Sequence, residues 1–176
     1  MADNRIRINT KGIEKLGKAL ADKYSIKVGI MGTKASKLHQ DSDLTNAQIG
    51  MIHEFGSNKR NIPQRSFLRQ PLMEHLPTYL SKKEEFKSKA IDEAIKEGTL
   101  FVLARKVGAV AEEVIQEAFA TRGFGKWAKN SNITVNGGWI RTSSGKAFYV
   151  KGKGSDSPLI DTGQLRRSIT SKVDKR

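Results

Sequence analysis

The segment from Thr99 to about Ala120 constrains the fold most, because it predicts one long and unusually apolar helix. Gly98 separates it from an amphipathic pattern upstream, and Thr99 can cap its first turn. Such a helix has to be buried, either in an antiparallel pair with the upstream helix or between that helix and a sheet. Its large apolar residues are Leu100, Phe101, Val102, Leu103, Val107, Val110, Val114, Ile115 and Phe119.

The upstream pattern predicts a second long, amphipathic helix, with Pro77 near its start or at a kink. A shorter helix is expected after Thr10, with Ile13, Leu16 and Leu20 on one face. The apolar positions of the upstream helix are Leu72, Leu76, Leu80, Phe86, Ala90 and Ile95.

Alternating residues predict strands near both ends of the chain. Tyr24–Met31 places its apolar residues on one side, and Arg5–Asn9 predicts a further short strand. Ser168–Val173 alternates as the last strand, and we expect it to pair with Tyr24–Met31.

Between these strands, Gly32–Leu44 is predicted to be a loop. Thr45 with Gln48 matches a capping box, which predicts a short helix that carries Ile49 and Ile52 inward. That helix is expected to end at Phe55–Gly56, with the glycine as a left-handed C-cap, before a basic loop or turn at Ser57–Pro63.

The region after Thr121 is rich in glycine and basic residues. Short strands are predicted at Ile133–Val135, Trp139–Arg141 and Ala147–Lys151, with a turn at Ser143–Gly145. The patterns together predict a single α+β domain over residues 1–176. It consists of a small mixed, mainly antiparallel sheet packed against two long helices, with a basic β-hairpin projecting at 130–152.

The chain of 176 residues has a net charge of +14 and no cysteine, which excludes disulfides and cysteine-ligated metal sites. The excess of positive charge lies in residues 1–73 and 122–176, so a polyanionic neighbour is indicated, either nucleic acid or an acidic protein surface. No segment is apolar enough for a membrane span or a signal peptide, so we expect synthesis in the cytoplasm and no membrane partner.

Two short motifs suggest enzymes but lack the residues that the chemistry requires. Asp161-Thr162-Gly163 matches an aspartic-protease triplet, but one copy would need a homodimer, so we interpret Asp161 or Thr162 as the cap of a helical turn at Gly163–Arg167. His53-Glu54 would need a second histidine at position 57, which is Ser57. We therefore expect no enzymatic activity, no cofactor and no metal.

Four segments occur in a characteristic order: Val28–Ile30, Ala47–Gly56, Ile62–Leu68 and Pro158–Ile169. Together they resemble the tail-completion or virion-morphogenesis family of tailed bacteriophages, which are small neck proteins, and they are similar to certain minor tail proteins. The chain departs from the family pattern at Ser66, where proline is usual, and in the added hairpin at 130–152.

The resemblance implies a structural virion protein at the head–tail junction. Copies of the chain would form a ring, by analogy a hexamer, between the connector or head-completion protein and the tail-terminator or tail-tube protein, with possible contact to the end of the packaged DNA. The motif residues it identifies are His53, Phe55, Gly56, Pro63, Phe67, Leu68, Asp161, Thr162, Gly163 and Leu165.

Polar loops and the hairpin are the candidate contacts with neighbours, through Lys59, Arg60, Trp139, Arg141, Lys146 and Phe148. Mixed basic and aromatic residues also suit nucleic acid, because aromatic rings stack on bases and cations neutralise phosphates. A DNA-binding module acting through the basic C-terminal third therefore remains the alternative.

Overall fold

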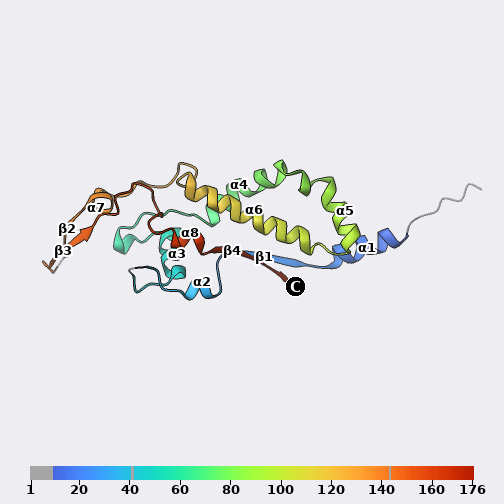
Figure 1. Ribbon diagram of the computed structural model, residues 1–176, viewed down its shortest axis with the longest axis horizontal. Coiled ribbons are helices and arrows are strands. Elements are labelled where there is room, and N and C mark those ends of the chain that lie inside the picture. Colours follow the sequence, from blue (N-terminus) through green and yellow to red (C-terminus); the bar gives the residue numbers. More distant parts are fainter. Residues whose placement is uncertain (1–9, 41, 143) are drawn as a thin grey trace, which may run out of the picture.

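The computed structural model (Figure 1) describes residues 10–40, 42–142 and 144–176 of an α+β fold, as predicted. The expected strand at Arg5–Asn9 and Ser143 of the expected turn lie outside these ranges. The strands are β1 (Tyr24–Ile30), β2 (Gly137–Arg141), β3 (Ala147–Lys151) and β4 (Ile169–Lys175). The helices are α1 (Thr10–Ala21), α2 (Thr33–Ser36), α3 (Asn46–Phe55), α4 (Arg69–Lys82), α5 (Ser88–Glu97), α6 (Phe101–Ala120), α7 (Asn132–Asn136) and α8 (Gln164–Arg167), with 3-10 turns η1 (Asn58–Arg60) and η2 (Glu84–Phe86).

The predicted pairing of the first and last strands is confirmed. β1 and β4 run antiparallel, in register from Tyr24 opposite Lys175 to Ile30 opposite Ile169. Within the described residues the sheets have two strands each and are wholly antiparallel, so they contain no parallel pair of the expected mixed, mainly antiparallel sheet.

The apolar helix α6 packs against α4 on one side and against β1 and β4 on the other. This is the second of the two arrangements predicted for it. The close approach to the sheet depends on Gly108, since a Cβ there would lie 2.9 Å from the Ser171 hydroxyl oxygen. The predicted cap at the start of α6 is partly present, because the Thr99 hydroxyl accepts a hydrogen bond from the Phe101 amide at 3.2 Å.

The single long helix predicted over Leu72–Ile95 is interrupted. α4 ends at Lys82, η2 follows, and α5 starts at Ser88 in a different direction (Figure 1). The two halves bury their apolar faces against different partners, because α4 packs on α6 whereas α5 packs on α1. Pro77 lies inside α4 and Gly98 ends α5 with φ 64°.

The core forms where α6 crosses the segment ahead of α4. Phe67 is fully buried, and its ring lies 5.3 Å from that of Phe119, which Trp127 contacts edge-on. Other core residues are Ile115, Ala118, Leu165 and Ile169. Phe67 thus packs the start of α4 onto the core.

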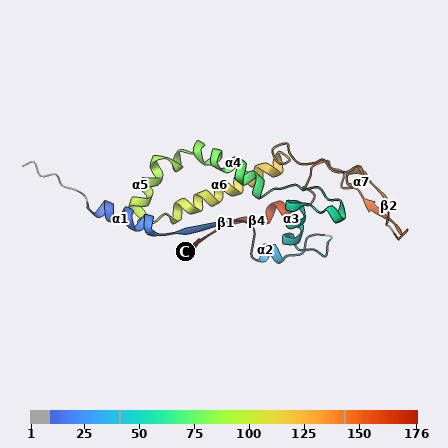
Figure 2. The same ribbon diagram turned by 180° about the vertical axis from the view of Figure 1, so that it is seen from behind.

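The β2–β3 hairpin projects from one end of an elongated body, and α1 lies at the opposite end (Figures 1 and 2). Ile133–Val135 belongs to helix α7 and not to a strand, because the Ser131 side chain caps its first turn by accepting from the Thr134 amide. Across the hairpin, Trp139 lies opposite Tyr149 and Ile140 opposite Phe148.

Candidate functional site

Two of the four motif segments, Ala47–Gly56 and Ile62–Leu68, meet at one buried carboxylate, that of Glu54 on α3. Its side chain is 5% exposed and belongs to the last turn of the helix. It accepts four hydrogen bonds, from the Ser66 hydroxyl at 2.6 Å and from the amides of Phe67, Leu68 and Arg69 at 2.9, 3.0 and 3.1 Å.

These bonds cap the N-terminus of α4 from outside the helix. The first amides of a helix have no partner within it and carry partial positive charge, which a carboxylate neutralises. Leu68, at the N-cap, has no oxygen in its side chain, so Glu54 supplies the missing acceptor. The Ser66 hydroxyl adds a further bond by accepting from the Gln70 amide at 3.0 Å.

Neighbouring residues join this junction to the loop after α6. The Arg65 guanidinium donates from Nε to the Ala128 carbonyl and from Nη2 to the Lys129 carbonyl, both at 2.9 Å. The Trp127 indole donates to the Ser66 carbonyl at 3.0 Å. None of Glu54, Arg65 and Ser66 was predicted as a site residue, because the hydrogen bonds of Glu54 and Arg65 join residues that lie 12 to 64 positions apart.

Gly56 ends α3, as predicted, but its conformation differs from the expected left-handed cap. Its φ of 73° is combined with ψ −179°, a region that glycine alone reaches easily. A Cβ at this position would lie 2.8 Å from the Gln64 amide nitrogen. Glycine therefore lets the chain return close to α3, where Gln64 donates to the Glu54 carbonyl.

In the Asp161-Thr162-Gly163 triplet it is Thr162 that caps α8. Its hydroxyl accepts from the Gln164 amide at 3.2 Å, and its carbonyl accepts from the Arg167 guanidinium at 2.9 Å. Asp161 is exposed and makes no hydrogen bond to the described residues. Of the two predicted caps, only Thr162 acts as one.

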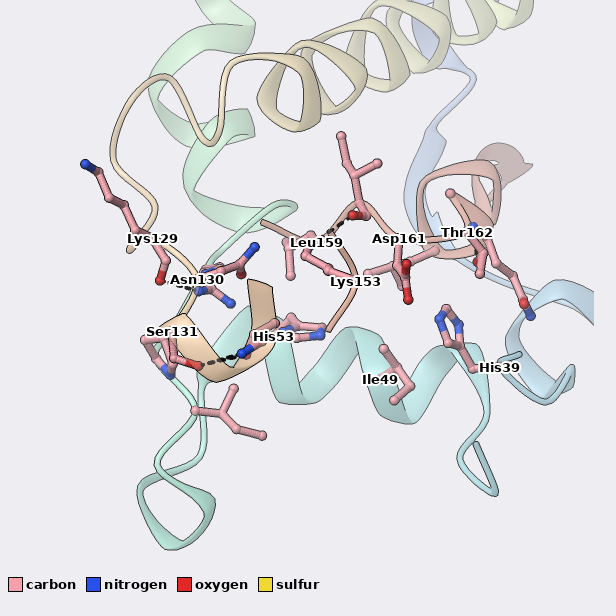
Figure 3. A pocket seen from close by; sticks show the side chains of 18 of the residues that line it. His39, Ile49, His53, Lys129, Asn130, Ser131, Lys153, Leu159, Asp161 and Thr162 are labelled. Atoms are coloured by element: carbon pink, nitrogen blue, oxygen red, sulfur yellow. Dashed lines mark hydrogen bonds between the residues drawn. The ribbon is translucent and has the colours of Figure 1, made fainter. Parts of the chain in front are cut away.

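A pocket of about 490 Å³ lies where three of the four motif segments meet, namely Ala47–Gly56, Ile62–Leu68 and Pro158–Ile169 (Figure 3). Six of the predicted motif residues line it: His53, Pro63, Asp161, Thr162, Gly163 and Leu165. Further polar residues that were not predicted as site residues also line it, among them Arg65, Lys153 and Gln164.

The positive charges of Arg65 and Lys153 act on His53 in the pocket. Burial, with the nearby charge of Arg65, lowers the pKa of His53 to about 4, so its imidazole is neutral at neutral pH. Its Nδ1 is buried without a hydrogen-bond partner among the described residues. Burial also lowers the pKa of Lys153, whose ammonium donates to the carbonyls of Ser157 and Ile160.

The remaining predicted residues lie on exposed surfaces. Phe55 is 62% exposed and borders an apolar pocket of about 320 Å³ with Met51 and Leu68, while Lys59 is exposed on η1. The side chain of Arg60 lies outside the described part of the chain. The hairpin exposes the other four: Trp139, Arg141, Lys146 and Phe148.

Tyr149 lies opposite Trp139 in the hairpin, with the two ring centres 5.7 Å apart, and is itself exposed. None of the described helices is long and apolar enough to cross a membrane. The described residues also contain no cluster of three or more histidine and acidic side chains that could hold a metal ion.

Comparisons of the chain with family models, curated proteins and solved structures find no match.

Proposed function

We propose that this chain is a structural protein of the neck of a tailed bacteriophage, where several copies form a closed ring that joins head to tail. One observation carries the proposal: large apolar side chains are exposed at both far ends of an elongated chain. Trp139 and Tyr149 lie on the hairpin at one end, and Ile13 and Leu20 lie on α1 at the other (Figure 1).

Exposed apolar surface of this kind marks contacts with other proteins. When two different surfaces of one chain contact each other in successive copies, the assembly is head-to-tail and closes into a ring if the rotation permits. The ring would lie between the connector or head-completion protein and the tail-terminator or tail-tube protein. The order of the four motif segments is the reason for choosing a neck protein among ring-forming proteins.

Electron microscopy and light scattering of the purified protein test the ring. We expect closed rings of more than two subunits at high protein concentration. A two-fold dimer that buries the same surface on both subunits would contradict the head-to-tail arrangement.

A DNA-binding module is the second candidate, because one face of the hairpin combines Trp139 and Tyr149 with Arg141 and Lys151. Aromatic rings beside cations suit single-stranded nucleic acid. Filter binding at two salt concentrations tests this candidate, which requires tight binding that weakens steeply as salt rises. Absence of binding near physiological salt would remove it.

A further inference from the structure

We infer that the pocket between α3, the Ile62–Leu68 segment and the Pro158–Ile169 segment binds a carboxylate side chain of an acidic peptide. The peptide would belong to a neighbouring protein in the neck, and in that respect the inference rests on the proposed function. The basis of the inference is that two of the cations that line the pocket, Arg65 and Lys153, form no ion pair with a carboxylate of the described residues.

Arg65 is the first of these cations. It is 7% exposed, yet it forms no ion pair with any carboxylate of the described residues. The carbonyls of Ala128 and Lys129 use two of its five N–H groups, and these carbonyls carry no charge. A buried charge without a counter-ion is unfavourable, so an anion in the pocket would be bound favourably.

Lys153 is the second cation, on the segment that follows the hairpin. Its ammonium donates to two carbonyls, those of Ser157 and Ile160, which leaves one of its three N–H groups free. The negative charge of Asp161 opposes the lowering of the pKa of Lys153, but Asp161 and Lys153 do not form an ion pair. Figure 3 shows Lys153 and Asp161 beside the same pocket, with His53 on the α3 side.

The walls favour a carboxylate on an apolar stem over the phosphate backbone of DNA. Much of the lining is aliphatic, including Ile49, Ile62, Leu159 and Ile160. Proteins usually contact DNA phosphates through exposed, long basic side chains, whereas Arg65 is buried beside these apolar walls. A volume of about 490 Å³ also lies within the range of pockets for small ligands.

Two three-residue peptides, acetylated and amidated, test the inference: Leu-Glu-Leu and its uncharged analogue Leu-Gln-Leu. We expect the glutamate peptide to shift the amide NMR signals of Asn130, Ser131 and Gln164 in a saturable way. The glutamine peptide should bind at least about tenfold more weakly, since it lacks the charge. Equal binding of both peptides, or no saturable shift, would overturn the inference.

Inorganic phosphate is the third ligand to be tested. If phosphate binds this pocket and the glutamate peptide does not, the pocket takes phosphate and the peptide proposal is wrong. The two peptides are compared on the unaltered chain, so this part of the test does not depend on whether any variant folds.

Lys153→Met tests the assignment to the pocket, with Lys151→Met on the exposed face of β3 as the matched control. We expect about tenfold weaker binding of the glutamate peptide by Lys153→Met and unchanged binding by Lys151→Met. Equal affinity of both variants would contradict the assignment. Peptide binding needs only a single chain. If the protein binds the peptide but forms no ring, the proposed ring is contradicted while the assignment of the pocket still holds.

Discussion

Glu54 near the end of α3 and Ser66 ahead of α4 are joined by a hydrogen bond of 2.6 Å from the serine hydroxyl to the carboxylate. The same carboxylate accepts from three successive amides, those of residues 67 to 69. The bond therefore belongs to a cap that holds α3 and α4 in one arrangement. The motif around Ile52–Gly56 and Ile62–Leu68 thus acquires a structural reason, because each part supplies one side of the cap.

Replacing Glu54 by alanine should destabilise the fold strongly. The change leaves a buried hydroxyl and the three amides of residues 67 to 69, at and just before the start of α4, without their acceptor. We expect this to lower the free energy of unfolding by about 3 kcal/mol or more. Urea unfolding measures the effect. Glu97→Gln, at an exposed site on α5, is the control and should change stability by less than about 0.5 kcal/mol. Similar stabilities for both variants would show that the cap contributes little.

Acid should destabilise the chain through His53. Its pKa is about 4 in the folded chain, against an ordinary value of 6.5, so the unfolded chain takes up the proton first as pH falls. The stabilisation is complete above about pH 6.5 and decreases toward pH 4 by about 1.4 kcal/mol per pH unit, or about 3 kcal/mol in total.

Unfolding by urea between pH 7 and pH 4 tests this prediction. His53→Gln should flatten the dependence of stability on pH in this window, whereas His75→Gln leaves His53 in place and should keep it. A pH dependence that persists unchanged in His53→Gln would assign the effect to other groups.

Gly108→Ala should destabilise the packing of α6 on the sheet. Alanine normally favours a helix over glycine by about 1 kcal/mol, but here the new methyl group would lie 2.9 Å from the Ser171 hydroxyl oxygen. We expect a net loss of about 1–3 kcal/mol from overpacking. Adding Ser171→Gly should recover most of the loss, because it removes the obstructing side chain.

Gly17→Ala on α1 is the matched control, since nothing lies within 4 Å of a Cβ there. It should stabilise the chain slightly in thermal unfolding. If Gly108→Ala is equally stabilising, the contact between α6 and β4 is looser than the structure indicates.

Trp139→Ser with Tyr149→Ser should leave the fold intact and weaken assembly. Trp139 is 71% exposed, so its removal loses little buried area within one chain. Light scattering measures the subunit number, and thermal unfolding checks the fold. A double variant that assembles like the unaltered protein would exclude the hairpin as a contact between copies.

The pairing of β1 with β4 and the capping box of α3 could be predicted because both follow from local patterns. Alternation along Tyr24–Met31 identifies the face that meets α6, and Thr45 with Gln48 caps α3 in the expected way, with both bonds of the box present. The break between α4 and α5 could not be predicted, because the helical spacing of apolar residues continues across it. The break arises because α4 packs on α6 and α5 packs on α1, and these partners cannot be read from the spacing.

The candidate site was only partly predictable for a similar reason. His53, Pro63 and Thr162 were selected through the resemblance, and the structure brings them to one pocket. The role of Glu54 could not be predicted, because it depends on amides 13 to 15 residues away in the chain. A helix start without a capping side chain, at Leu68, is the signal in the sequence that could have pointed to an outside acceptor.

Electron microscopy of phage particles assembled without this chain tests the central claim most directly. If the chain forms the ring that joins head to tail, its loss should leave filled heads and complete tails that are not joined, and addition of the purified protein should restore joining. Complete, joined particles in its absence would contradict the assignment to the neck.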